Sequence, residues 1–260
     1  MTRPEKFAAF ADLHVPGVPL ILFNVWDAGS AVIAERAGAK AIATGSWSVA
    51  AAQGFHDAEA LPMPLALDNA RRITAATNLP VSIDFEGGYA SDPDETAANM
   101  AALAATGAIG CNFEDQVIGA PVRALYALAE QAARIAASRA AVGADFFINA
   151  RTDIFLINPA ATHDAAMVDL AIERARTYAA AGASGFFVPG LADLSLLERV
   201  CAASPLPVNF MAFADAPSAA QVAGTGVARI SHGPGPYRLA MRAFEEAAKA
   251  AFTGAYTKLR

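Results

Sequence analysis

The chain has 260 residues, of which 55% are hydrophobic and 17% are charged, and its formal net charge is −6. This much apolar sequence can fill one large core, and the acidic balance argues against nucleic acid or an anionic membrane surface as a partner. The two cysteines, Cys111 and Cys201, lie far apart and form no disulfide or zinc-binding pattern. We therefore expect a soluble, cytoplasmic protein.

Eight short apolar segments recur along the chain, and a turn signal precedes each of them. Three segments begin directly after a proline, which a strand tolerates at its first residue. The other five follow a glycine that ends an alanine-rich or apolar stretch, as expected where a helix stops and a strand begins. The predicted strands are 20–23, 41–43, 81–83, 109–113, 146–150, 185–188, 208–210 and 228–230.

The alternation of these strands with helix-length segments predicts the fold class. Short, nearly continuous apolar strands between helices are typical of parallel strands that helices cover. Eight such units without a linker favour an α/β fold of the (β/α)8 TIM-barrel type, with residues 1–260 as a single domain that includes an N-terminal and a C-terminal helix. A doubly wound open sheet is the alternative, because periodicity does not reveal closure.

Polar side chains gather where the central predicted strands end. Asp84 and Glu86 end the third strand, Glu114 the fourth and Arg151 the fifth. Barrel enzymes carry their active sites at these strand ends, and residues two apart on a strand point the same way. Three converging carboxylates repel each other unless they are protonated or neutralised by a cation. Oxygen ligands without nearby cysteine or a histidine pair favour Mg²⁺ or Mn²⁺ over zinc.

Arg151 is placed to bind a substrate carboxylate through two parallel hydrogen bonds. The alternative is structural: the carboxylates would cap helices and Arg151 would pair with Glu114. A Schiff-base mechanism is excluded because it needs a lysine in the pocket. The chain's lysines, none of which ends a predicted strand, are Lys6, Lys40, Lys249 and Lys258.

Seven segments, in this order, resemble motifs of the isocitrate lyase/phosphoenolpyruvate mutase superfamily, and in particular its 2-methylisocitrate lyase-like members. They are 24–30, 44–47, 53–57, 84–89, 112–115, 148–153 and 187–190. The resemblance implies a barrel whose last helix is swapped between protomers of a homotetramer, a dimer of dimers. It also implies a Mg²⁺ site (Mn²⁺ is a further candidate) formed by Asp57, Asp84, Glu86 and Glu114.

The same resemblance implies how a small oxo-acid or hydroxy-acid substrate is bound. The backbone amides of Gly45, Ser46 and Trp47 would form an oxyanion-binding turn, and Arg151 and Asn209 would bind the substrate carboxylate. Ser46, Glu114 and Arg151 are the expected catalytic residues. An oxo-acid that chelates Mg²⁺ would leave a pyruvate-type enolate when the adjacent bond breaks, with its charge stabilised by the metal and the turn amides.

Two segments depart from the family pattern. The loop 116–123 contains no Cys, Lys or His where the lyases have a Lys-Lys-Cys-Gly-His motif, and Pro189 stands where mutases have histidine. We expect residues 116–125 to form a mobile lid. The favoured function is a carbon–carbon lyase or decarboxylase for oxaloacetate-like or methylisocitrate-like acids. A P–C bond enzyme (phosphonomutase or phosphonopyruvate hydrolase) and a non-catalytic oxo-acid-binding protein are the alternatives.

Overall fold

A computed structural model describes residues 1–254, and its centre is a barrel of eight parallel strands. The sheet runs in the order β1-β8-β7-β6-β5-β4-β3-β2, and a parallel bridge between Val25 and Thr44 joins the regions that follow β1 and β2. The predicted strands and the barrel are confirmed, and the open doubly wound sheet is wrong. The strands are β1 Leu20–Leu22, β2 Ile42–Ala43, β3 Val81–Asp84, β4 Gly110–Glu114, β5 Phe147–Arg151, β6 Gly185–Phe187, β7 Val208–Met211 and β8 Arg229–Ser231.

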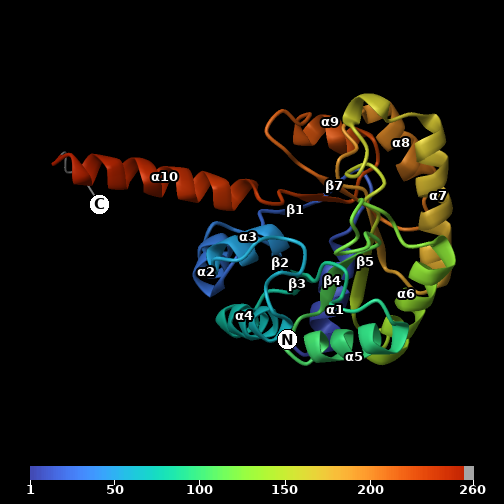
Figure 1. Cartoon of the computed structure of the whole chain (residues 1–260), viewed down its shortest axis with the longest axis horizontal. Helices are drawn as coiled ribbons and strands as arrows, with labels where there is room; N and C mark the ends of the chain where they lie inside the picture. Colours follow the sequence, from blue (N-terminus) through green and yellow to red (C-terminus); the bar gives the residue numbers. More distant parts are fainter. Residues whose placement is uncertain (255–260) are drawn as a thin grey trace.

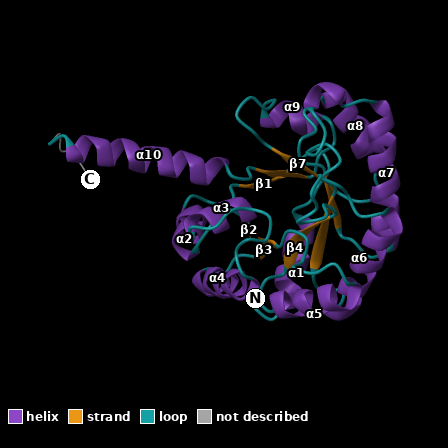
Figure 2. Ribbon diagram, viewed as in Figure 1, coloured by secondary structure: helices purple, strands orange, loops and turns teal. Residues whose placement is uncertain are grey.

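Most of the helices lie around the outer side of this barrel (Figures 1 and 2). Apolar residues on the outward faces of the strands and the inward faces of the helices form the largest core cluster. None of the helices among residues 1–254 is both long and apolar enough to span a membrane. The helices are α1 Arg3–Asp12, α2 Ala28–Arg36, α3 Ser46–Ala52, α4 Met63–Ala76, α5 Pro93–Ala104, α6 Leu128–Val142, α7 Ala165–Ala180, α8 Leu194–Ala203, α9 Ala219–Gly224 and α10 Gly235–Phe252, with a 3-10 turn at Ala160–Thr162.

The N-terminal end of the barrel is closed by α1. Phe10 of this helix is fully buried and packs edge-on against Phe147 of β5, in a cluster that also contains Leu20 and Ile109. His14 follows α1 and stacks on Phe147 with 4.5 Å between ring centroids. This apolar floor leaves the opposite, C-terminal end of the barrel as the place for polar chemistry.

Above the floor, the barrel interior is polar. Side chains alternate along a strand, so Cys111 of β4 contacts Met100 of α5 on the outside, whereas Asn112 points inward. Asn112, Asn149, Asn209 and Arg229 are all buried and joined by hydrogen bonds. The residues at the C-terminal ends of the strands therefore rest on a hydrogen-bonded layer and not on an apolar core.

Beyond its first turn, where Tyr237 lies edge-on to Trp26 and Arg238 lies over the ring of Trp47, the helix α10 does not pack on the barrel of its own chain. It extends away from the other helices (Figure 1), and Pro236 is its one buried residue. Phe244 of this helix is 72% exposed, and on the barrel the side chains of Ile21 and Phe23 are 45% and 53% exposed. Outward-facing strand residues of a barrel are normally covered by a helix. The predicted swap of this helix between protomers stays a prediction.

Candidate active site

A pocket of about 160 Å³ opens at the C-terminal ends of the strands. It brings together six of the nine predicted site residues: Gly45, Ser46, Trp47, Asp57, Asp84 and Arg151. The remaining lining residues are Asn24, Asn112, Leu156, Phe187, Met211, Ser231, Gly233 and Pro234. A side cavity of about 20 Å³ adjoins it and shares Ser46 and Asp84 with it. Glu86 lines this side cavity.

Asp84 is held by hydrogen bonds at both of its carboxylate oxygens. The backbone N–H and the hydroxyl of Ser46, the first residue of α3, both donate to Oδ2 at 2.9 Å. The Nδ2 of Asn112 donates to Oδ1 at 3.1 Å. The helix dipole and the donors at the start of α3 favour a negative charge at this position. Of the three predicted oxyanion-binding amides, that of Ser46 is thus bonded to Asp84.

Arg151 and Glu114 form the ion pair that the sequence left open as a structural alternative. Nη1 of Arg151 lies 2.7 Å from Oε2 of Glu114, and Nε and Nη2 of Arg151 lie 2.5 and 2.8 Å from the two oxygens of Asp153. These bonds leave only part of the guanidinium free for a substrate carboxylate. Asp153 was not predicted; its spacing of two residues from Arg151, on the same strand end, was the available signal.

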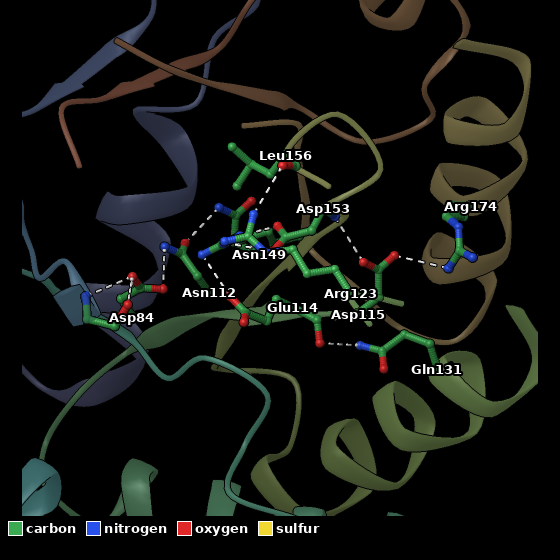
Figure 3. A network of polar contacts seen from close by, with 12 residues as sticks. Asp84, Asn112, Glu114, Asp115, Arg123, Gln131, Asn149, Asp153, Leu156 and Arg174 are labelled. Atoms are coloured by element: carbon green, nitrogen blue, oxygen red, sulfur yellow. Dashed lines mark hydrogen bonds and ion pairs between the residues drawn. The ribbon is translucent and has the colours of Figure 1, made fainter. Parts of the chain in front are cut away.

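Burial and the neighbouring charges shift the pKa values of both Arg151 and Glu114. Burial would lower the pKa of Arg151, but Asp153 and Glu114 outweigh it and raise that pKa well above its usual value. Burial also raises the pKa of Glu114, although the neighbouring Arg151 opposes the rise. Figure 3 shows Glu114 and Asp153 together with Asn112 and Asn149 of the barrel interior. The positive charge of Arg151 is therefore already shared between two carboxylates.

Burial and neighbouring carboxylates raise the pKa of the other two predicted metal ligands, Glu86 and Asp57. Burial, and then repulsion from Asp57, raises the pKa of Glu86 to about 8. Burial and the adjacent Asp84 raise the pKa of Asp57. Glu86 has a left-handed backbone (φ 49°), and its carboxylate accepts a 2.8 Å hydrogen bond from the backbone N–H of Glu59. Glu59 was also not predicted, and nothing in its sequence context marked it.

The predicted carboxylates share one end of the barrel but do not form a ready three-ligand cluster. Within residues 1–254, no three acidic, histidine or cysteine side chains are arranged to hold a metal ion together. Mg²⁺ needs only one or two direct carboxylates, because it retains several waters. The oxygen-only carboxylate donors of the pocket, Asp57 and Asp84, therefore fit a divalent cation.

Asn209 lies deeper than the sequence suggested. It belongs to β7 and is buried, and its Oδ1 accepts a 3.0 Å hydrogen bond from Asn149 while its Nδ2 donates to Ser231. It is not among the residues that line the pocket. Its binding of a substrate carboxylate stays a prediction.

One wall of the pocket is apolar, and the sequence did not predict it. Phe187 is the last residue of β6 and Met211 the last of β7, and Leu156 comes from the loop after β5. Among residues 1–254, Arg151 is the one cationic side chain that lines the pocket. The pocket therefore has an acidic and polar side next to an arginine, and an apolar side.

Comparison with known proteins identifies relatives of this chain. The family described as phosphoenolpyruvate phosphomutase matches residues 10–252. The structure of a protein from Burkholderia cenocepacia J2315, provisionally classed as a phosphonomutase, is 50% identical with a TM-score of 0.92, over 96% of this chain and all (100%) of that one. The 2-methylisocitrate lyase of Escherichia coli K12 is 32% identical over 75% of this chain and 69% of its own length. The oxaloacetate decarboxylase of Bradyrhizobium sp. BTAi1 is 31% identical over 71% of this chain and 63% of its own length.

Proposed function

Because the chain belongs to the phosphoenolpyruvate phosphomutase family, we propose that it is a Mg²⁺-dependent enzyme that cleaves a carbon–carbon bond in a small 2-oxo or 2-hydroxy acid. Decarboxylation of an oxaloacetate-like acid is the reaction that the pocket supports best. The observation that carries the proposal is the division of the pocket into an acidic side with Arg151 and an apolar wall formed by Leu156, Phe187 and Met211.

Asp84 and Asp57 would hold the cation, with water completing its coordination. A bound divalent cation supplies a Lewis acid that polarises the oxygens of a chelating oxo-acid. The free part of the Arg151 guanidinium binds the substrate carboxylate next to the oxo group. The turn at Gly45 and Trp47 orients the oxo group, while Ser46 keeps Asp84 in place through two hydrogen bonds.

The apolar wall favours the loss of a carboxylate as CO₂. A carboxylate placed against Leu156, Phe187 and Met211 loses its hydration without gaining a partner, whereas neutral CO₂ loses nothing there. The bond to the departing carbon breaks, its electron pair stays on the remaining fragment as a pyruvate-type enolate, and CO₂ leaves. Water then protonates the carbon, because the Ser46 hydroxyl proton is already directed at Asp84.

The size of the pocket favours a small acid. Its volume of about 160 Å³ is close to the roughly 150 Å³ of an engineered cavity that holds benzene. A tricarboxylate such as methylisocitrate is considerably larger and would bring further negative charges to a pocket in which, among residues 1–254, Arg151 is the one cationic side chain. Oxaloacetate-like acids therefore fit better than methylisocitrate-like ones.

P–C bond chemistry is the second candidate, favoured by the 50% identity to a protein provisionally classed as a phosphonomutase. A phosphonyl group carries more charge than a carboxylate and normally needs several cationic or N–H donors. The apolar wall of this pocket offers none of these. We therefore rank phosphonate chemistry second, and non-catalytic binding of an oxo-acid third.

The test is a panel of oxo-acids assayed with Mg²⁺, with Mn²⁺ and with excess EDTA. We expect pyruvate and CO₂ from oxaloacetate, loss of activity with EDTA, and recovery when metal is restored. Asp84→Ala should remain folded but lose metal binding, whereas Asp169→Ala, which removes an exposed surface partner of Arg199, should behave as wild type. Undiminished turnover in EDTA contradicts the proposal. Phosphate release from phosphonopyruvate would favour the second candidate, and ligand binding without turnover the third.

A further inference from the structure

Arg229 of β8 is a fully buried arginine inside the barrel. Its Nε donates to the hydroxyl of Ser231 at 3.2 Å and its Nη2 donates to Oδ1 of Asn112 at 3.1 Å. Within residues 1–254 it forms no ion pair, and its Nη1 has no hydrogen-bond partner. Burial lowers its pKa to about 10, which leaves the guanidinium protonated at neutral pH. An unpaired buried charge is costly, so a purely structural reason for this residue is weak.

The contact with Arg229 determines which way the Asn112 amide points. An asparagine amide can be turned either way, but arginine only donates hydrogen bonds and so requires the oxygen of Asn112 to face it. Nδ2 of Asn149 donates to the same oxygen at 2.9 Å. The Nδ2 of Asn112 is consequently directed at Oδ1 of Asp84, at 3.1 Å. Figure 3 shows Asp84, Asn112 and Asn149 in this arrangement.

Gly185 provides room for the second donor. A Cβ added to this glycine would lie 2.7 Å from Oδ1 of Asn149, which is closer than real Cβ atoms come. The missing side chain on β6 therefore lets Asn149 occupy the barrel interior and bond to Asn112. Donors from two strands, β8 and β5, thus fix the amide group of Asn112 on β4, and this amide holds one oxygen of Asp84.

We propose that Arg229 is a positioning residue for the cation site: through Asn112 it sets the direction of Asp84 Oδ1 and so supports the binding of a divalent cation. The inference rests on the proposed function, in which Asp84 is a metal ligand. Groups that orient a metal ligand typically contribute about 10–100-fold to metal affinity. Arg229 touches neither the substrate nor the metal, and Asn112 transmits its positioning effect to Asp84.

The sign of the effect separates this role from a simple charge effect. A positive charge beneath a cation site repels the cation, so removing it by electrostatics alone would strengthen metal binding. If Arg229 positions Asp84, its removal weakens metal binding instead. The measurement is Mn²⁺ affinity by electron paramagnetic resonance or calorimetry, without substrate, on the full chain.

We expect Arg229→Met to weaken Mn²⁺ binding by about tenfold. The control is Arg139→Met, which removes a half-buried arginine that bonds to the backbone of Gly182 and to Ser184 outside the pocket. It should keep wild-type affinity even if it melts at a lower temperature. Unchanged or tighter Mn²⁺ binding by folded Arg229→Met overturns the inference.

Asn112→Leu provides a second route if Arg229→Met does not fold. It should show the same loss of affinity, and wild-type affinity in this variant also overturns the inference. In the double variant the two losses should not add, because Arg229 acts through Asn112; full additivity contradicts the relay. If the wild-type chain itself binds no Mn²⁺, the proposed function fails. If wild type and variants bind Mn²⁺ equally well, the proposed function stands and only the role of Arg229 is overturned.

Discussion

Arg151 shares its guanidinium between Asp153 and Glu114, so its geometry matters as much as its charge. Arg151→Lys keeps the charge but removes the planar fork. We expect the affinity for oxalate in the presence of Mg²⁺ to fall by about 1–3 kcal/mol, measured by calorimetry. Arg174→Lys is the control, because Arg174 pairs with Asp115 and does not line the pocket. Wild-type binding by Arg151→Lys would mean that this arginine is structural.

His14 is a second residue with a measurable consequence. Burial, and then the charge of Arg229, lowers its pKa to about 3, and its Nδ1 lies 2.8 Å from the carbonyl oxygen of Phe10. The unfolded chain binds a proton at His14 below its ordinary pKa of 6.5, whereas the folded chain stays neutral there until about 3. The stability that neutral His14 contributes is therefore complete above this window and is lost as the pH falls through it.

We expect wild type to lose about 2 kcal/mol of unfolding free energy through His14 between pH 7 and pH 5. His14→Phe keeps an aromatic ring against Phe147 but cannot titrate, so its stability should fall less over the same range. The measurement is urea unfolding at both pH values in EDTA. The buried carboxylates titrate in both proteins, so the difference between them isolates His14. Equal losses in the two proteins would contradict the buried, neutral state.

At the scale of elements, the segment 116–125 after β4 is a closed hairpin-like loop. Gln116 forms an antiparallel bridge with Leu125, and the N–H of Val117 donates to the carbonyl of Ala124 at 2.8 Å. Nη1 of Arg123 lies 3.5 Å from the carbonyl oxygen of Leu156, which lines the pocket (Figure 3). The base of the loop is thus fixed, and its tip lies next to the pocket. The predicted mobility of the loop stays a prediction.

A lid that closes over substrate would separate the reacting carbon from bulk solvent and leave a bound water to protonate it. We expect amide hydrogen exchange in residues 118–123 to slow when Mg²⁺ and oxalate are added, while exchange in residues 213–217, an exposed loop after β7, does not change. Deleting residues 117–120 should lower turnover about tenfold or more, since loop closure normally completes such sites. Identical exchange with and without ligand, or full turnover after the deletion, would make the segment a fixed connection.

At the scale of the whole molecule, most of α10 and the surface around β1 are two apolar faces that no other part of residues 1–254 covers. A groove of about 490 Å³ is lined by Leu13, Val18, Pro19, Leu20, Ile21, Phe23, Ala34, Ala37, Gly38, Ala39 and Lys40. On α10, the side chains of Leu239, Met241 and Phe244 are exposed. Contiguous exposed apolar surface of this kind usually marks a protein interface. We propose that a second copy of the chain covers these faces by exchange of α10, within a dimer of dimers.

Phe244→Asp tests this assembly. The variant should have a lower mass by light scattering than the tetramer that we expect for wild type, because burying an unpaired carboxylate in an apolar interface is unfavourable. Leu170→Asp alters a comparably exposed leucine on α7, which is 52% exposed, and should leave the mass unchanged. A wild-type mass for Phe244→Asp, or a monomeric wild type, would rule out the exchange as proposed.

The sequence by itself determined the eight strands, the barrel class and one edge of the site. Turn residues and short apolar runs encode strands locally, and the parallel order of strands brings their C-terminal ends to the same edge. Asp84, Ser46 and Arg151 could therefore be assigned to one pocket before any contact was known. Their residue types alone indicated carboxylate and cation chemistry.

The tertiary structure decided what joins those strand ends to the rest of the barrel. Arg229 and Asn112 are 117 positions apart, and their contact depends on the stagger of the closed sheet, which periodicity does not encode. Periodicity likewise does not encode how the Arg151 guanidinium is shared between Glu114 and Asp153, or how deeply Asn209 is buried in the barrel. The departure of α10 from its own barrel also left no trace in its amphipathic pattern. A helix with one apolar face needs a surface to cover, but its sequence does not say which copy of the chain supplies that surface.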